Sequence, residues 1–173
     1  MNILYIATSI DGYIAKPDGS VDWLSVAQQE DEDYGYNAFY DSIDALVMGS
    51  HTYQQLVDAD KWPYENKPSY VMSDQALPRL SDEVRVVSGS AYVMQDLLVE
   101  EQFERVWLVG GGKLASAFQH ARLIDEYIIS VIPVILGNGI PLFDSVDDDQ
   151  PVDLTETKRF GTGVVQLHYS AST

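Results

Sequence analysis

One stretch decides the fold of this chain: Arg105-Val106-Trp107-Leu108-Val109-Gly110-Gly111-Gly112-Lys113-Leu114. A short apolar run ends in three consecutive glycines and a helix-compatible segment follows, which predicts a buried strand that turns tightly into a helix N-terminus. Glycines at such a turn let the backbone approach a ligand closely, and the free N–H groups of the helix N-terminus suit a phosphate. A strand-to-helix turn that only needs positive φ is the alternative interpretation, because the triplet is not a full G-x-G-x-x-G pattern.

Length and composition indicate one folded domain over residues 1–173. The chain has 173 residues, of which 46% are hydrophobic, enough for a sizeable core. It contains no cysteine, which excludes disulfides, thiolate zinc sites and cysteine nucleophiles and fits a cytoplasmic protein. The N-terminus, Met1-Asn2-Ile3-Leu4-Tyr5, lacks the features of a signal peptide, and no apolar run approaches the roughly 20 residues of a membrane helix.

The chain is strongly acidic. Lys and Arg number 10 against 27 Asp and Glu, and the formal net charge is −17. Such a surface repels nucleic acid and anionic lipid at long range, so we expect neither a nucleic-acid nor a membrane partner. Local structure would therefore have to attract an anionic cofactor. His120 and His168 are isolated from other metal-ligating residues, so we expect no metal site.

Apolar runs alternate with amphipathic segments through most of the chain. Tyr36, Phe39, Tyr40 and Ile43, for example, recur at helical spacing. Strands that alternate with helices predict an α/β fold with a mostly parallel sheet, helices on both faces and an antiparallel C-terminal edge. The expected strands are 2–9, 45–49, 69–73, 84–88, 106–109, 126–135, 151–159 and 164–169, and the expected helices are 28–44, 50–56, 91–103 and the segment from the glycine triplet to Ala121.

Four of the expected strands end in turn or phosphate-binding chemistry, at 8–12, 49–52, 73–74 and 110–114. In open α/β sheets, ligands bind beyond the carboxyl ends of the strands, near a switch in strand order. Four such ends together favour the ligand interpretation of the glycine triplet over a plain turn.

These pieces resemble the dihydrofolate reductase superfamily. Within it, the chain is most similar to small bacterial proteins that look like the C-terminal reductase domain of bifunctional riboflavin-biosynthesis deaminase/reductases. The resemblance implies a three-layer fold, a homodimer and a reductase that transfers hydride from NAD(P)H to a pteridine- or pyrimidine-like heterocycle. It rests on Thr8-Ser9-Ile10-Asp11-Gly12-Tyr13-Ile14-Ala15, Gly19-Ser20-Val21-Asp22-Trp23-Leu24, Asp44-Ala45-Leu46-Val47-Met48-Gly49-Ser50-His51-Thr52-Tyr53 and Val109-Gly110-Gly111-Gly112-Lys113-Leu114.

The family pattern also implies where the cofactor lies. Backbone groups of Ala7 and Ile14 would meet the nicotinamide carboxamide. The pyrophosphate would lie between two helix N-termini, and Ser73 and Asp74 would lie near the adenosine ribose. The residues implied for the two N-termini are Gly49, Ser50, His51 and Thr52 on one side and Gly110, Gly111, Gly112, Lys113 and Leu114 on the other.

Two departures from the family pattern concern the choice of cofactor. Ser50 stands where an arginine commonly neutralises the 2′-phosphate of NADPH, and Asp74 stands where small hydroxyl residues usually face that phosphate. A lost cation and a gained anion both penalise a dianionic group. NADPH is the cofactor that the resemblance implies, and we hypothesise a weakened preference that allows NADH. A protonated His51 would offset part of the loss.

The expected substrate side is rich in acids. The segment 22–44 contains seven acidic residues and no Lys or Arg, which argues against the phosphorylated riboflavin intermediate as the substrate. Asp33 falls on the apolar stripe of the expected helix, where burial would raise its pKa and allow it to supply a proton as the catalytic acid. Alternatively, Asp33 sits in the first helical turn and only favours the helix dipole. Asp22 and Trp23 are further candidates for the substrate pocket.

Two other functions stay open at this point. A nucleotide-binding sensor would keep the cofactor cleft without turnover, and a purely structural homodimer would need no cofactor at all. The C-terminal strands would supply a dimer contact, because exposed sheet edges need covering. Cofactor binding without reduction of any acceptor would favour the sensor.

Overall fold

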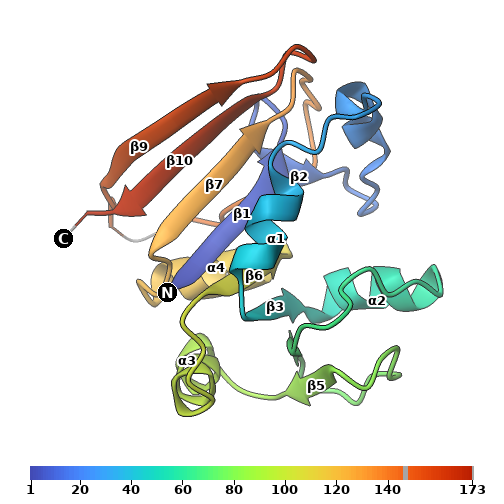
Figure 1. The fold of residues 1–173 in the computed structure, drawn as a ribbon, viewed down its shortest axis with the longest axis vertical. Helices are drawn as coiled ribbons and strands as arrows, with labels where there is room; N and C mark the ends of the chain where they lie inside the picture. Colours follow the sequence, from blue (N-terminus) through green and yellow to red (C-terminus); the bar gives the residue numbers. More distant parts are fainter. Residues whose placement is uncertain (146–147, 173) are drawn as a thin grey trace.

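The computed structural model describes residues 1–145 and 148–172 and is built on a mixed sheet. Within these residues the sheet has eight strands, in the order β5-β4-β3-β6-β1-β7-β10-β9 (Figure 1). β10 runs antiparallel to β7 and β9, and the other neighbouring pairs are parallel. This arrangement confirms the predicted α/β fold with its antiparallel C-terminal edge. The strands are β1 (Asn2–Thr8), β3 (Ala45–Gly49), β4 (Ser69–Met72), β5 (Val84–Val87), β6 (Val106–Gly110), β7 (Glu126–Val131), β9 (Val152–Arg159) and β10 (Val165–Ala171), and β2 (Tyr13–Ala15) pairs separately with β8 (Ile140–Pro141).

Helices cover both faces of the sheet, as predicted. Side chains alternate along β1, so Ile3 belongs to a core cluster with Phe39 of α1, while Leu4 belongs to a second cluster with Phe118 of α4. Each large apolar side chain buried in this way contributes about 1.5–3 kcal/mol relative to leaving it exposed. Figure 1 shows α1 in front of the central strands and α4 behind them. The helices are α1 (Tyr36–Ser42), α2 (Ser50–Asp58), α3 (Ala91–Glu100) and α4 (Gly112–His120).

The segment 28–44 is not one helix, so that prediction was wrong. A 3-10 helix, Asp22–Ala27, comes first, and α1 begins only at Tyr36. Between them the backbone takes positive φ at Asp31 (64°) and Tyr34 (57°), a conformation that a right-handed helix cannot contain. The residues between the two helices therefore form a loop.

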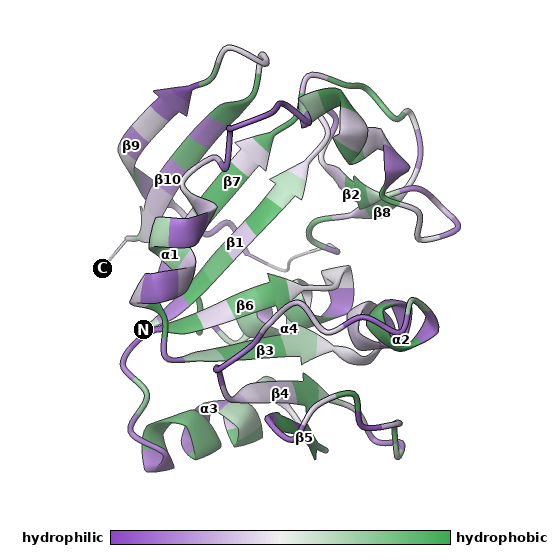
Figure 2. Ribbon diagram, turned by 45° about the vertical axis from the view of Figure 1, so that its right-hand side comes forward, coloured by the Kyte–Doolittle hydropathy of each residue, from purple (hydrophilic) through white to green (hydrophobic). Residues whose placement is uncertain are grey.

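The edge strand β9 is exposed on both faces. All eight of its residues are exposed, including the apolar Val152 (39%) and Leu154 (57%). Figure 2 shows that β9 is largely hydrophilic, whereas β1 and β3 further into the sheet are largely hydrophobic. Within the described residues only β10 pairs with it, which leaves one edge open to strand-to-strand association.

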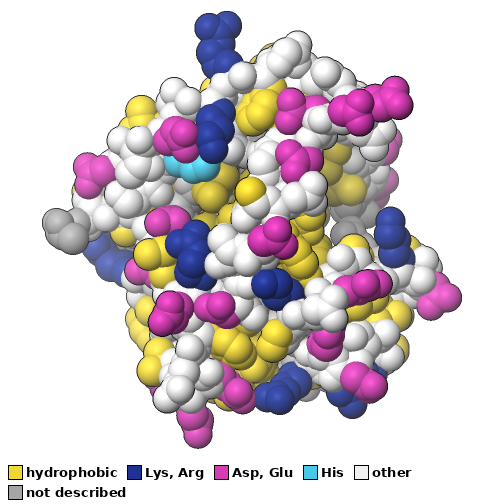
Figure 3. All heavy atoms as spheres, viewed as in Figure 1, with side chains coloured by type: hydrophobic (Ala, Val, Ile, Leu, Met, Phe, Trp, Pro, Cys, Tyr) yellow, Lys and Arg dark blue, Asp and Glu magenta, His cyan; other side chains and the backbone are white. Residues whose placement is uncertain are grey.

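Acidic side chains do not gather at one place on the face shown in Figure 3. On the face in Figure 3, acidic side chains lie scattered among Lys and Arg side chains, with apolar side chains between them. No helix within the described ranges is long and apolar enough to cross a membrane. The net charge therefore does not mark a site by itself.

Candidate functional site

Two cavities open near the carboxyl ends of the parallel strands. One cavity, called the acidic cavity below, has a volume of about 550 Å³ and is lined by Glu30, Glu32 and Asp33 among others. The other, called the glycine cavity, has a volume of about 570 Å³ and is lined by Gly49, Gly111 and Gly112 among others. Ile6, Ala7 and Leu24 line both, so the two cavities meet beside the end of β1. The two cavities are therefore neighbours at this end of the sheet.

The N-termini of α2 and α4 both open on the glycine cavity. Each helix follows directly on a strand, α2 on β3 and α4 on β6. The N-cap residues, Gly49 and Gly111, offer no side-chain cap, so the first N–H groups of both helices are available to a ligand. Two N-termini that face one cavity suit an anion with two phosphate groups. The residues of these turns that line the cavity are Gly49, Ser50, His51, Thr52, Gly111, Gly112, Lys113 and Leu114.

The first two glycines of the triplet both have a positive φ, 125° at Gly110 and 93° at Gly111, but they have different neighbours. Gly110 is buried and does not line the cavity; a Cβ atom there would lie 2.9 Å from the Ile6 Cδ1 atom. Gly111 has a φ of 93°, which L side chains rarely adopt, and a Cβ atom on it would lie 3.3 Å from the Thr52 hydroxyl oxygen. Gly110 therefore packs behind the cavity, whereas Gly111 brings α2 and α4 close together.

The predicted nicotinamide residues also line the glycine cavity. Ala7 is one of the residues shared with the acidic cavity, and Ile14 of β2 lines the glycine cavity. Ile140 and Pro141 of β8, the strand paired with β2, also line it. The small β2–β8 pair thus forms one wall of the glycine cavity.

Asp11 holds the loop that leads to β8. Its carboxylate accepts hydrogen bonds from the Ser9 hydroxyl at 2.6 Å and from the backbone N–H groups of Gly137 at 2.7 Å and Leu136 at 3.1 Å. The Ser9 hydroxyl, followed by the two backbone N–H groups, holds the pKa of Asp11 below its ordinary value. Asp11 is therefore a structural clamp between the β1–β2 turn and the loop before β8.

Ser73 and Asp74 lie at the same sheet edge but line neither cavity. They follow β4, whose Met72 is in register with Gly49 of β3, so they neighbour the start of α2. The Ser73 hydroxyl accepts a hydrogen bond from the Gln75 backbone N–H, and the Asp74 carboxylate accepts one from the Ser88 hydroxyl at 2.5 Å. Their contact with an adenosine ribose stays a prediction.

The acidic cavity combines aromatic walls with a polar inner end. Tyr5, Tyr36 and Trp107 supply aromatic surface, and Ser130 supplies a hydroxyl from β7. Several lining residues come from the loop between the 3-10 helix and α1. No Lys, Arg or His occurs among the described residues that line this cavity. The described residues also contain no group of three or more His, Asp or Glu side chains suited to a metal ion.

Asp33 lines the acidic cavity, but the premise for its role as a catalytic acid was wrong. Its side chain is exposed rather than buried, and its carboxylate accepts hydrogen bonds from the backbone N–H groups of Gly35 at 2.9 Å and Asn37 at 3.1 Å. These two N–H groups lower the pKa of Asp33 instead of raising it. The alternative interpretation is correct only in part: Asp33 precedes the first turn of α1, which contains no acid, but its carboxylate accepts hydrogen bonds at the start of that helix and is ionised at neutral pH.

Asp22 and Trp23 do not line either cavity, which contradicts the prediction that they face the substrate. Asp22 is exposed and forms an ion pair with Lys16 at 2.8 Å, and the hydrogen bond from that lysine lowers the pKa of Asp22. Trp23 is only 5% exposed and packs in a core cluster with Ile132. The next residue, Leu24, takes the cavity-facing position.

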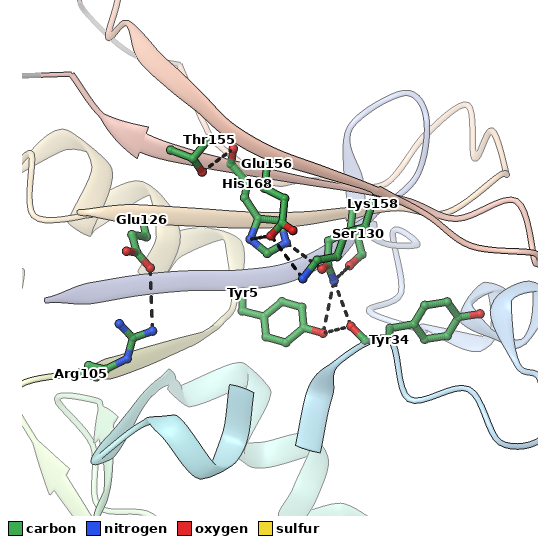
Figure 4. Close-up of polar contacts among 10 residues, drawn as sticks. Tyr5, Tyr34, Arg105, Glu126, Ser130, Thr155, Glu156, Lys158 and His168 are labelled. Carbon is green, nitrogen blue, oxygen red and sulfur yellow. Dashed lines mark hydrogen bonds and ion pairs between the residues drawn. The ribbon is translucent and has the colours of Figure 1, made fainter. Parts of the chain in front are cut away.

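Sequence reasoning missed a buried polar network behind the acidic cavity (Figure 4). Gln166 of β10 is 2% exposed, and its side-chain amide nitrogen contacts the Ser130 hydroxyl at 3.1 Å, the Tyr34 carbonyl at 3.4 Å and the Tyr5 hydroxyl at 3.5 Å. Its amide oxygen lies 2.8 Å from Nε2 of His168. Gln166 and His168 alternate with apolar residues, a pattern that predicts one polar face on this strand. The pattern does not predict which residues that face contacts.

The partners fix the orientation of this network. A backbone carbonyl only accepts hydrogen bonds, so the amide nitrogen of Gln166 must face Tyr34 and the amide oxygen must face His168. His168 therefore donates from Nε2. Burial, as the largest cause, lowers the pKa of His168, which keeps the ring neutral at neutral pH.

The sheet order and the paired helix N-termini define a dihydrofolate reductase-like protein. The RibD C-terminal domain family matches residues 2–166, and the chain belongs to this family. This confirms the resemblance that the sequence motifs indicated. The family consists of pyrimidine reductases that use NAD(P)H on small heterocyclic substrates.

Individual relatives match the chain over different shares of their length. "Uncharacterized protein YwjB" of Bacillus subtilis (strain 168) is 40% identical over 168 residues, which cover 96% of this chain and 95% of YwjB. A crystal structure of a protein from Shewanella sp. PV-4 has a TM-score of 0.91 at 32% identity and covers 99% of both chains. The riboflavin biosynthesis protein RibD of Mycobacterium tuberculosis (strain ATCC 25618 / H37Rv) is 29% identical over 152 residues, 81% of this chain but 44% of RibD.

Proposed function

We propose that the chain is an NAD(P)H-dependent oxidoreductase that holds the dinucleotide in the glycine cavity and reduces a pteridine- or pyrimidine-like heterocycle in the acidic cavity. The observation that carries this proposal is the junction of the two cavities at Ile6, Ala7 and Leu24. Hydride transfer needs the two reacting atoms about 3–3.5 Å apart, and neighbouring cavities that share these residues support such an approach.

The residues of the glycine cavity fit a dinucleotide. The uncapped N-termini of α2 and α4 would hold the pyrophosphate, and the hydroxyls of Ser50 and Thr52 add hydrogen-bonding groups beside it. The nicotinamide would lie at Ala7 and Ile14, next to the acidic cavity. When bound, the reduced nicotinamide supplies the hydride, while the chain supplies the position.

The reduced substrate also needs a proton. Asp33 is ionised at neutral pH because its pKa is lowered, so it accepts hydrogen bonds from a substrate rather than giving up a proton. The exposed carboxylates of Asp33 and Glu30 at the mouth of the cavity keep water there. We propose that the proton comes from this water.

We propose NADPH as a cofactor with NADH as a comparable alternative. Ser50 lines the glycine cavity in the place where the family pattern has an arginine, so a 2′-phosphate gains no guanidinium. Titration of the protein with both reduced cofactors measures the preference. Binding of NADPH at least about tenfold tighter than NADH, 1.4 kcal/mol, would contradict the proposal.

The test of the proposed reaction is the loss of reduced-nicotinamide absorbance against a panel of pterin and pyrimidine acceptors. We expect cofactor binding and the reduction of at least one acceptor. Leu24→Trp, which narrows the junction, should lose turnover. Val26→Trp, at an exposed position outside both cavities, is the matched control and should retain it. Failure to bind either cofactor contradicts the proposal, and binding without reduction of any acceptor favours the sensor.

The open edge of β9 supports a homodimer as the assembly state. Val152 and Leu154 are exposed apolar side chains on this strand, and a second copy of the chain would cover them. Sedimentation of the protein with and without Leu154→Glu measures this. A wild-type chain that sediments as a monomer at micromolar concentration would contradict the homodimer.

A further inference from the structure

The two cavities differ in charge. The acidic and basic side chains that line the glycine cavity are Asp144, Lys113 and His51. It therefore offers basic groups to an anionic ligand. The acidic cavity is lined by Glu30, Glu32 and Asp33, and its described lining residues include no base. An anionic group that is tolerated in one cavity is repelled in the other.

Two of the three carboxylates are fixed in place by backbone hydrogen bonds. Glu32 accepts one from the N–H of Tyr34 at 2.8 Å, and Asp33 accepts two, from Gly35 at 2.9 Å and Asn37 at 3.1 Å. Neither carboxylate forms an ion pair within the described residues. Their negative charge therefore stays at the cavity wall and is not neutralised by a side chain.

The inner end of the acidic cavity is neutral. The hydroxyls of Tyr5 and Ser130 reach it, and both contact the side-chain amide nitrogen of Gln166. Because that amide nitrogen is taken up by these hydroxyls and by the Tyr34 carbonyl, it is not free to donate to a ligand. The Ser130 hydroxyl accepts one of these bonds and keeps its own proton, whereas the three carboxylates only accept hydrogen bonds. The acceptor groups of the lining are therefore concentrated at the carboxylates, beside the aromatic walls of Tyr36 and Trp107.

We infer that the acidic cavity selects a planar heterocycle that is neutral or cationic, presents amino or ring N–H groups, and carries no phosphate. The inference rests on the proposed function only in treating this cavity as the place of the substrate. Donor groups of the ring meet the carboxylates at the mouth, and the Ser130 hydroxyl at the inner end can donate to a ring acceptor. A phosphate monoester would meet three carboxylates and no cation.

The test is calorimetric titration of the cofactor-free protein with matched ligands. The probes are 2,4-diaminopyrimidine, cytosine and pterin as free rings, and cytidine with cytidine 5′-monophosphate as a pair that differs only in the phosphate. We expect at least one free ring to bind. We expect the monophosphate to bind at least about tenfold more weakly than cytidine at low salt, and the difference to shrink at high salt because salt screens the repulsion.

A charge-reversal pair makes the test specific to the cavity. Glu30→Lys should strengthen binding of the monophosphate at least about tenfold, whereas Glu100→Lys, on α3 at the opposite face, makes the same change in net charge and should leave it within about twofold. Equal or tighter binding of the monophosphate to the wild-type protein overturns the inference, and so does a panel in which no ring binds. Discrimination against phosphate in a protein that reduces no acceptor leaves the inference standing and defeats the proposed reaction instead.

Discussion

Replacement of Gly111 by alanine is the sharpest test of how the glycine cavity is built. At φ 93° and ψ 127° an L residue is in a region that costs about 1–3 kcal/mol. The new Cβ atom would also lie 3.3 Å from the Thr52 hydroxyl oxygen, so either the hydroxyl or the helix it belongs to must shift. Together the two effects predict a loss of about 2–3 kcal/mol in the free energy of unfolding.

Two other glycines separate the backbone effect from the contact. Gly137 has a φ of 75° but nothing within 4 Å of its Cβ position, so Gly137→Ala should cost about 1 kcal/mol for conformation alone. Gly161 has neither positive φ nor a neighbour, so Gly161→Ala should stay within about 0.5 kcal/mol of the wild type.

Urea unfolding followed by tryptophan fluorescence measures all three variants, and a loss of 2 kcal/mol moves the midpoint by about 1 M. Titration with NADPH is the second readout, in which Gly111→Ala should weaken binding at least about tenfold because the two helix N-termini move apart. The reasoning is refuted if Gly111→Ala unfolds within about 0.5 kcal/mol of Gly161→Ala.

Three further changes test other parts of the site. Ser50→Arg should raise the preference for NADPH over NADH by at least about tenfold, because a guanidinium supplies charge-assisted hydrogen bonds to a 2′-phosphate. Titration with both cofactors measures this preference. The control Gln54→Arg, one turn further along α2, should not change it. Gln166→Leu should lower the free energy of unfolding by about 1–3 kcal/mol, because it removes the buried hydrogen bond to the Ser130 hydroxyl and leaves Nε2 of His168 without its acceptor. A loss under about 0.5 kcal/mol in urea unfolding would contradict the network. The folded-state pKa of Asp11 lies below its ordinary 3.8, so the stability that Asp11 contributes is fully present above that value and is lost as the pH falls through the folded-state pKa. The free energies of unfolding of wild type and Asp11→Asn, measured against pH, should therefore converge at low pH. Parallel curves down to full protonation would contradict the role of Asp11 as a structural clamp.

Most of the sheet could be predicted from local pattern. The runs that became β3 and β6 are buried along nearly their whole length, and such short apolar runs between helical segments predict parallel strands without knowledge of any distant contact. The turns at Gly49 and Gly111 could also be predicted, because a turn from a strand into a helix depends on adjacent residues. The predicted features that the structure confirms are thus those set by short-range sequence.

The parts that could not be predicted depend on distant residues or on exceptional backbone conformations. Gln166 contacts Tyr5 across 161 positions of sequence, and no pattern within β10 names that partner. The helical spacing of Tyr36, Phe39 and Tyr40 is real, but it spans only the turns that α1 contains, and its extension upstream to residue 28 failed. Non-glycine residues with positive φ are uncommon, so composition gave no warning of the break.

That break is what creates the acidic cavity. Had the helix continued upstream through Glu30, its backbone N–H groups would have been used inside the helix, and those that hold Glu32 and Asp33 would not have been free. Because the chain leaves the helical conformation between Ala27 and Tyr36, the loop can line the space beside β1 and present its carboxylates there. Departures from local preference are expected to concentrate at functional sites. The segment in which sequence reasoning failed is accordingly the segment to which we assign the choice of substrate, while the well-predicted glycine turns are assigned to the cofactor that the whole family shares.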